Sequence, residues 1–231
     1  MSTAAFAQTY KVYEPKAAAA SMPTLVFLHG GAWIGGDLSQ YEGGARAYNL
    51  KHVRVILANY RLAPKFKHPA PVDDLDAVLK KLPADYSRIY LMGHSAGAHL
   101  IAFWNTAHTD ARVRGFIGIE GIYDIPKLVK VWPSYRGSFI SAEFGPDASK
   151  WAAASPAALP ARSKVPWLLI HSEKDELVDL AQTTDFQKHL ISQKIPVELM
   201  QLKTESHFGA IETLSDFESP IFLKTHSFFK H

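Results

Sequence analysis

The stretch Arg88-Ile89-Tyr90-Leu91-Met92-Gly93-His94-Ser95-Ala96-Gly97 places a serine between a strand and a helix. Residues 88–92 are typical of a buried strand, and residues 96–108 are typical of a buried helix. The Gly-x-Ser-x-Gly pattern therefore lies at a strand-to-helix turn, where small neighbours permit a sharp bend. Such a bend lifts the hydroxyl of Ser95 above the sheet. We therefore predict that Ser95 is a nucleophile; the alternative is a plain tight turn.

Further strands and helices alternate on both sides of this turn. Six other short apolar runs predict strands: residues 9–13, 24–28, 53–58, 113–119, 165–171 and 197–202. Other helices are expected in three places: from Asp73 and Asp74 to Leu82, over 180–191, and after Ser219-Pro220. This alternation predicts an α/β fold with a mostly parallel, doubly wound sheet flanked by helices. We find no repeat or linker, so a single domain is expected over residues 1–231.

A long irregular insertion, residues 121–164, separates two of the predicted strands. It is rich in Pro, Ser and Ala and carries six aromatic residues: Tyr123, Trp132, Tyr135, Phe139, Phe144 and Trp151. Loops of this length inside a compact domain are typically lids or binding segments. We interpret the insertion as lid-like; the alternative is a set of short helices packed on the sheet edge.

The composition excludes several classes of protein. Among 231 residues there is no cysteine, which rules out disulfides, thiolate metal sites and cysteine nucleophiles. The net charge of +3 comes from scattered residues, so neither a nucleic-acid partner nor a membrane partner is expected. No apolar stretch suits a bilayer span, and residues 1–9 have neither a basic region nor a long apolar core, so we expect no secretory signal. We expect a cytoplasmic protein, with no cofactor and no metal, because phosphate-loop and metal-ligand spacings are missing.

A serine nucleophile needs a general base, and the base needs a carboxylate that orients it. On folds of this kind the chain order is serine, acid, histidine. Asp175 follows the strand over 165–171 and His207 follows the strand over 197–202, so both are predicted at the carboxyl edge of the sheet. The alternatives for the acid are Glu173, Glu176 and Asp179, and those for the base are His226 and His231.

The segment His29-Gly30-Gly31-Ala32-Trp33 directly follows the strand over 24–28. Two adjacent glycines allow the backbone to approach a ligand closely and to present N–H groups to it. Together with the N–H of Ala96, this loop predicts a pocket for the oxyanion of a tetrahedral intermediate. The alternative is a turn without chemistry, and Trp33 is either a packing residue or a pocket wall.

The His-Gly-Gly-Ala-Trp and Gly-His-Ser-Ala-Gly-Ala-His segments, with the Asp175 and His207 loops, resemble the α/β-hydrolase superfamily over nearly the whole chain. The first two segments are similar to those of kynurenine formamidases (arylformamidases), as are residues 119–124 and the pair Phe144-Gly145. Residues 59–64, Asn-Tyr-Arg-Leu-Ala-Pro, are similar instead to carboxylesterases of the hormone-sensitive-lipase type. The resemblance implies an α/β-hydrolase fold.

The same resemblance implies roles for individual residues. Ser95, Asp175 and His207 would form a catalytic triad. The oxyanion donors would be the N–H groups of Gly31 and Ala96, together with that of Ala32 or Gly30.

Two features of the chain differ from the carboxylesterase group. That group usually has a third glycine where this chain has Ala32, and only about two dozen residues precede the strand over 24–28. We therefore expect no large N-terminal cap, so that residues 121–164 roof the pocket. Trp33, Tyr123 and Phe208 are candidates to stack on a planar substrate; alternatively they belong to the core.

These observations predict a serine hydrolase that cleaves a small ester or N-formyl amide through an acyl- or formyl-enzyme. The formamidase resemblance favours the conversion of N-formylkynurenine to kynurenine and formate. One alternative is a general small-molecule carboxylesterase. Another is a non-catalytic ligand receptor on the same fold, which the presence of all three triad residues disfavours. The expected partner is a small molecule, with a twofold homodimer as the general default.

Overall fold

The computed structural model describes residues 10–17, 19 and 21–230. Seven strands form one sheet in the order β1-β3-β2-β4-β5-β6-β7. β1 (Tyr10–Tyr13) runs antiparallel to β3 (Arg54–Ala58), and the other described neighbours are parallel. The remaining strands are β2 (Thr24–Leu28), β4 (Ile89–His94), β5 (Val113–Ile119), β6 (Trp167–Ser172) and β7 (Val197–Leu202). The predicted mostly parallel α/β sheet is confirmed, while Thr9 of the first predicted strand lies outside the described residues.

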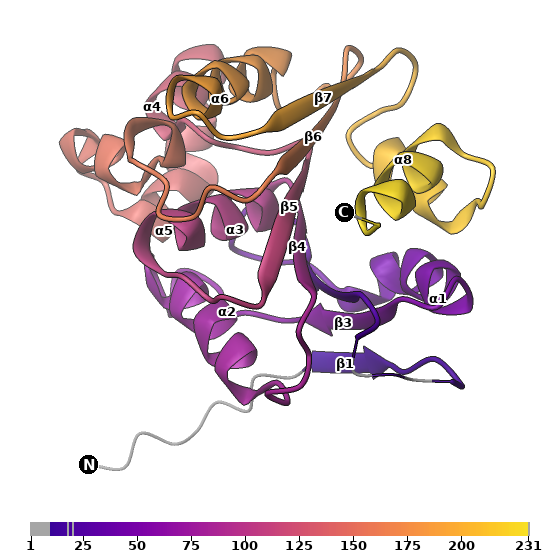
Figure 1. The fold of residues 1–231 in the computed structure, drawn as a ribbon. Helices are drawn as coiled ribbons and strands as arrows, with labels where there is room; N and C mark the ends of the chain where they lie inside the picture. Colours follow the sequence, from indigo (N-terminus) through magenta and orange to yellow (C-terminus); the bar gives the residue numbers. More distant parts are fainter. Residues whose placement is uncertain (1–9, 18, 20, 231) are drawn as a thin grey trace, which may run out of the picture.

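Helices cover both faces of the sheet (Figure 1). α1 (Glu42–Leu50) and α8 (Pro220–Phe228) lie on one face, and α2 (Ala70–Lys81), α3 (Ala96–Ala107) and α6 (Leu180–Ser192) lie on the other. Because strand side chains alternate, β2 supplies Val26 and Leu28 to one core and Leu25 and Phe27 to the second. Each face therefore has its own hydrophobic core, as in a doubly wound fold. Within the described ranges, no helix combines the length and apolar character needed to cross a bilayer.

Two helices differ from the sequence-based expectation. The sequence patterns predict no helix between β2 and β3, yet this region contains α1. Glycine disfavours helices, but a Cβ on Gly44 would lie 3.0 Å from the Cβ of Leu214, so the glycine allows close packing. α2 begins at Ala70, three residues before Asp73, with Pro71 in its first turn, where the missing N–H is harmless.

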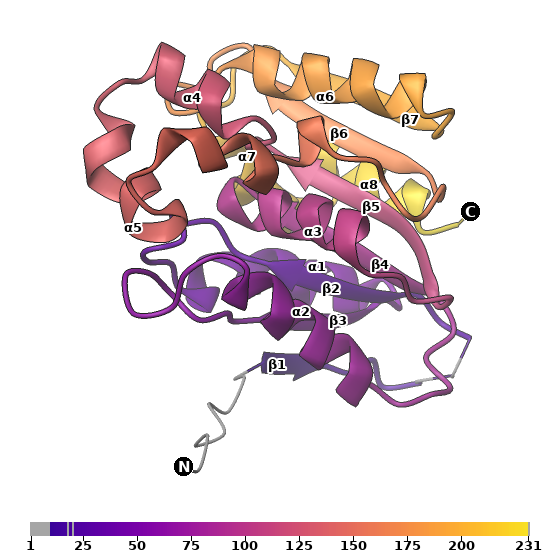
Figure 2. The ribbon, with the colours of Figure 1, turned by 90° about the vertical axis from the view of Figure 1, so that its left-hand side faces the viewer.

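The insertion over residues 121–164 consists of short helical segments. It contains α4 (Ile125–Val131), a π-helical turn (Arg136–Ile140), α5 (Ser141–Phe144) and three 3-10 turns (Ala148–Lys150, Ala152–Ala154 and Pro156–Ala158). α4 and α5 lie beyond the end of the sheet toward which β5 and β6 point (Figure 2). The insertion thus borders the carboxyl edge of the sheet, where the candidate site residues lie.

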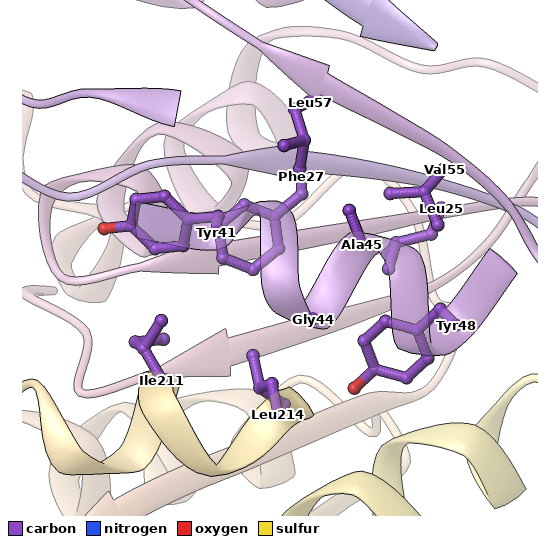
Figure 3. Close-up of a pocket in the computed structure, with 10 residues that line it drawn as sticks. All are labelled: Leu25, Phe27, Tyr41, Gly44, Ala45, Tyr48, Val55, Leu57, Ile211 and Leu214. Atoms are coloured by element: carbon purple, nitrogen blue, oxygen red, sulfur yellow. The ribbon is translucent and has the colours of Figure 1, made fainter. Parts of the chain in front are cut away.

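A small cavity lies on the other face of the sheet, between α1 and the strands (Figure 3). Its volume is about 10 Å³, which is at the lower limit for holding a single water molecule. Its lining is mainly apolar: Leu25, Phe27, Tyr41, Gly44, Ala45, Tyr48, Val55, Leu57, Ile211 and Leu214. A cavity of this size cannot hold a substrate, so it is not a candidate active site.

Candidate active site

Ser95 occupies a strained bend between β4 and α3. Its backbone has φ 53° and ψ −117°, which is rare for a residue with a side chain. A Cβ on Gly93 would lie 2.3 Å from the backbone of Gly97, and one on Gly97 would lie 2.3 Å from the carbonyl oxygen of Leu28. Both motif glycines are therefore required by close backbone contacts. The Ser95 side chain forms no capping hydrogen bond with α3, so the helix does not occupy its hydroxyl.

Asp175 and His207 form a buried pair at the carboxyl edge of the sheet. The Nδ1 of His207 lies 2.7 Å from Oδ2 of Asp175, and both side chains are at most 3% exposed. The other carboxylate oxygen accepts the backbone N–H groups of Leu177 (2.8 Å) and Val178 (2.9 Å). Although burial raises the pKa of Asp175, hydrogen bonds from His207 and Glu120 lower it to about 2. An ionised Asp175 fixes the proton on Nδ1 of His207 and leaves Nε2 as the basic nitrogen.

The rival acids have other partners. Glu173 is exposed and pairs with Lys203. Asp179 caps α6 by accepting the N–H of Ala181. Glu176 accepts the backbone N–H of His207 at 3.2 Å and so stabilises the histidine loop. Among the described contacts, the Glu176 carboxylate makes no hydrogen bond to the imidazole ring of His207.

A second contact ties the acid and base loops together. The hydroxyl of Ser172, at the end of β6, donates to the carbonyl oxygen of Glu205 at 2.5 Å. The same hydroxyl accepts the N–H of Lys174 at 3.0 Å. Ser172 therefore holds the loop after β7 against the loop after β6, which brings His207 to Asp175.

A hydrogen-bonded chain joins the glycine loop to the histidine loop. The N–H of Gly30 donates to the Tyr41 hydroxyl (2.8 Å), and Tyr41 lies 3.0 Å from Nδ1 of His94. Nε2 of His94 lies 3.1 Å from the carbonyl oxygen of His207, which can only accept, so Nε2 carries the proton. Burial lowers the pKa of His94 to about 3 and raises that of Tyr41 to about 12, so Tyr41 donates to a neutral imidazole. Sequence analysis did not identify Tyr41, because nothing near it in the chain marks this role.

Ser95 lies in the same neighbourhood as His207. The rings of His94 and His207 are 4.7 Å apart between centroids, and Ser95 is the next residue after His94. A Cβ on Gly30 would lie 3.2 Å from the Cβ of Ser95, so the glycine loop adjoins the serine as well. Among the described residues, no hydrogen bond joins the Ser95 hydroxyl to the His207 ring. Catalytic hydrogen bonds often form only when substrate binds, so this geometry is compatible with a triad.

Three N–H groups are candidates for an oxyanion hole. Gly31 and Ala32 have positive φ values of 120° and 52°, and in the described part of the chain their amides donate to no backbone carbonyl. The N–H of Ala96 belongs to the first turn of α3, whose amides have no partner inside the helix. Gly30, by contrast, already donates to Tyr41. This contact favours Ala32 over Gly30 as the partner of Gly31.

The aromatic candidates have different surroundings. Trp33 is fully buried and lies edge-on to Phe144, at 5.0 Å between ring centroids. Tyr123 is also fully buried and stacks on Phe186 at 4.1 Å, which places it in the core rather than at an accessible surface. Phe208 is 47% exposed and lies edge-on to His207 at 5.3 Å. Of the three, Phe208 is therefore the one that is both accessible and adjacent to the base.

Glu143, in the insertion, is a buried acid that sequence analysis did not identify. Its side chain is 1% exposed, and neither carboxyl oxygen has a hydrogen-bond partner among the described residues. Burial raises the pKa of Glu143 to about 8, so its carboxyl is mainly neutral at pH 7. The charge of Lys67 lowers the pKa of Glu143, but by less than burial raises it, so the neutral form is favoured.

We expect Glu143 to make the protein less stable as the pH rises. Between its ordinary pKa of 4.5 and about 8, the unfolded chain has released a proton that the folded protein retains, so the free energy of unfolding falls across this window. The side chain in Glu143→Gln cannot titrate, so this variant does not lose stability in the same way. The melting temperature of Glu143→Gln minus that of the unchanged protein should therefore be larger at pH 8.5 than at pH 5, by on the order of 5 °C. Thermal unfolding at both pH values measures this gain, with the exposed Glu198→Gln as control. An equal difference at both pH values would contradict the prediction.

Fold and site geometry together define the protein as a hydrolase of the α/β-hydrolase class. The model of the BD-FAE family matches residues 10–190, and the chain belongs to this family. A kynurenine formamidase from Meyerozyma guilliermondii is 29% identical, over 89% of this chain and 83% of that protein. Carboxylesterase NlhH from Mycobacterium tuberculosis is 35% identical, over 40% of this chain and 31% of that protein.

Solved structures confirm the fold. An acetyl ester-xyloside bifunctional hydrolase from Caldicellulosiruptor lactoaceticus superposes with a TM-score of 0.78. The match covers 96% of this chain and 86% of that one, at 20% sequence identity. At this identity the likeness concerns the fold alone.

Proposed function

We propose that the protein is a serine hydrolase that cleaves a small N-formyl amide or ester, with Ser95 as nucleophile, His207 as base and Asp175 as the residue that orients the base. The observation that carries this proposal is the buried Asp175–His207 pair, 2.7 Å apart, beside the strained bend that presents Ser95. A strained serine backbone makes folding less favourable, and so does a histidine fixed in one tautomer. A role in catalysis explains why both are present.

The first half of the reaction forms a covalent intermediate. The Ser95 Oγ attacks the carbonyl carbon of the substrate while Nε2 of His207 takes the hydroxyl proton. The negative oxygen of the tetrahedral intermediate accepts hydrogen bonds from the N–H groups of Gly31, Ala32 and Ala96. When this intermediate collapses, the C–N or C–O bond breaks, and His207 gives its proton to the leaving amine or alcohol. The acyl group, or the formyl group, stays on Ser95.

The second half releases the acid. Water attacks the carbonyl carbon of the acyl-enzyme, and Nε2 of His207 takes a proton from that water. The same N–H groups donate hydrogen bonds to the second oxyanion. Collapse breaks the bond to Ser95 Oγ, which recovers a proton from His207, and the product leaves as formic or another carboxylic acid, which releases its own proton to solvent. Asp175 remains ionised throughout and stabilises the imidazolium in both halves.

N-formylkynurenine is the substrate that we favour. The relative named kynurenine formamidase aligns over most of both chains, whereas the carboxylesterase aligns over less than half of either. Phe208, exposed beside His207, offers a ring on which an aromatic amine could stack. A general carboxylesterase is the second candidate, and its support is the 35% identity to carboxylesterase NlhH over 100 residues.

A side-by-side rate comparison tests the substrate. We expect kcat/KM for N-formylkynurenine to exceed that for p-nitrophenyl acetate and p-nitrophenyl butyrate by about tenfold or more, because a fitted leaving group adds binding energy in the transition state. Faster turnover of the esters, with N-formylkynurenine untouched, would identify a carboxylesterase instead. If no substrate is cleaved and a phosphonate probe leaves Ser95 unlabelled in folded protein, the result supports a non-catalytic ligand receptor instead.

A further inference from the structure

Glu120 is a fully buried acid directly behind the proposed triad. It follows the last residue of β5, and its backbone has a φ of 49°. The backbone N–H of Glu120 donates to the carbonyl oxygen of Ile170 at 2.9 Å, which fixes the bend against β6. The side chain is 0% exposed, so the carboxyl has no access to solvent. The proposed mechanism does not use this group.

The contacts of Glu120 lead to the acid of the triad. Its two carboxyl oxygens lie 3.0 Å and 3.2 Å from the N–H of Ser172, which donates to them. Burial, followed by the hydrogen bond with Asp175, raises the pKa of Glu120 to about 10. The carboxyl groups of Glu120 and Asp175, together with the ring of His171, place three polar atoms within 4.8 Å of one another.

Two buried carboxyl groups in contact cannot both be ionised at low cost, so one of them retains a proton. Asp175 faces His207 and accepts two backbone N–H groups, all of which favour its ionised form. Glu120 has no cation against it, because its other contacts are the Ser172 amide and a histidine whose pKa burial lowers. The proton therefore belongs on Glu120, which makes its carboxyl a hydrogen-bond donor.

We propose that Glu120 is a positioning residue, whose neutral carboxyl donates a hydrogen bond to Asp175 and holds that carboxylate in place against Nδ1 of His207. This inference rests on the proposed function, since it assigns Glu120 a role in the same reaction. Glu120 touches neither substrate nor reacting atoms; it acts through Asp175. With the proton present, the buried group carries a single negative charge, which matches the single positive charge that forms on His207.

A cation in place of this proton would need an open lone pair on His171. Nδ1 of His171 lies 2.7 Å from the hydroxyl of Thr183, which can donate to it. Nε2 lies 2.9 Å from the carbonyl oxygen of Val178, which can only accept, so Nε2 carries the proton. Both ring nitrogens are therefore engaged, and the arrangement suits a shared proton rather than a metal ion.

The neighbourhood of Glu120 contains other groups that titrate. The groups that act on Glu120 or Asp175 from the strands and loops packed against them are Tyr123, Tyr135, His171, Glu176 and His207, while Asp179 acts on His171. Burial, and secondarily Glu120, raises the pKa of Tyr123 far above its ordinary value, so this phenol stays neutral. A loss of activity at alkaline pH that is absent from a Glu120 variant is therefore caused by ionisation of Glu120 itself.

Three variants of the full chain test the proposal. Glu120→Gln keeps the size of the side chain, one donor for Asp175 and one acceptor for Ser172, so kcat should stay within about threefold of the unchanged protein. Glu120→Ala removes the donor, so kcat should fall by about tenfold or more with KM changed by less than about twofold. Glu198→Gln, on the exposed side of β7, controls for the loss of one carboxyl.

The pH profile provides a readout that a structural role would not change. Without a donor, Asp175 concentrates more negative charge at His207, so the acid limb of kcat/KM should move to higher pH in Glu120→Ala and stay in place in Glu120→Gln. The unchanged protein should lose activity as Glu120 ionises near pH 10, a loss that Glu120→Gln should not show. Equal profiles and rates for all variants would overturn the proposal. Loss of activity with a chelator, restored by a divalent cation, would overturn it too.

A second measurement does not depend on turnover. The low-field proton resonance of Nδ1–H of His207, assigned by its loss in His207→Gln, should persist in Glu120→Gln and shift or broaden in Glu120→Ala. Should the latter variant fail to fold, Glu120→Gln alone decides, through its rate and its missing alkaline loss. If the resonance responds as expected while no substrate is cleaved, the proposed function fails and the positioning contact stands. If cleavage occurs and the resonance is identical in all variants, the positioning role fails.

Discussion

Ser95→Ala is expected to lower kcat by about 10⁴-fold or more, because removal of the hydroxyl leaves no atom to form the covalent intermediate. Folding should be nearly intact, since the substitution removes one oxygen that makes no capping hydrogen bond with α3. The measurement is kcat for the best substrate, with thermal unfolding of the same preparation.

Ser172→Ala is not a suitable comparison for this variant, because the Ser172 hydroxyl joins the acid and base loops. Ser227→Ala, an exposed serine of α8, provides the matched control and should retain full activity. Activity of Ser95→Ala within about tenfold of the unchanged protein would assign the nucleophile to another residue.

His207→Ala is expected to cause a loss of similar size, about 10⁴-fold in kcat, because Ser95 then has no base to take its proton. Asp175→Asn should cost less, since the histidine keeps its place and loses the partner that fixes its tautomer and stabilises its charged form. Rates for both variants and for the double variant measure how far the two residues act as a unit. The double variant should be little worse than His207→Ala alone.

His226→Ala distinguishes His207 from the alternative base, His226. His226 lies in the last turn of α8, where its ring stacks on Phe222, and it should be dispensable for turnover. A large loss in His226→Ala, together with near-normal activity in His207→Ala, would show that the base has been misassigned.

The sheet could be predicted because each of its strands is a short apolar run that can be recognised from the sequence alone. β5 and β7 have the bounds that the apolar runs indicated. The helix expected after Ser219 is α8, and the Ser219 hydroxyl caps it by accepting the N–H of Phe222. Local patterns suffice where a buried strand or a capped helix is determined by neighbouring residues. α1 could not be predicted in this way, since its two glycines pack against residues far along the chain, Gly43 against Ser215 and Gly44 against Leu214.

Positions in the candidate site could be predicted only where a motif or a strand end marks them. Ser95 lies in a recognisable pattern, and Asp175 and His207 follow the two last strands. Tyr41 and Glu143 carry no such mark. Glu120 does follow the end of β5, but its contact with the loop after β6 comes from a segment distant in sequence. Tyr123 is an example of the opposite case. Its place in the insertion suggested a pocket residue, yet its ring stacks on Phe186 in the core.

The central claim is that Ser95 is a nucleophile activated by His207. Its most direct test is covalent labelling of the folded protein with a fluorophosphonate, followed by peptide mass spectrometry to locate the modified residue. We expect one phosphonylated site, at Ser95, formed at least about 100-fold more slowly in His207→Ala and not at all in Ser95→Ala. A modified residue other than Ser95, or hydrolysis of substrate by protein whose Ser95 remains unlabelled, would show that Ser95 is not the nucleophile.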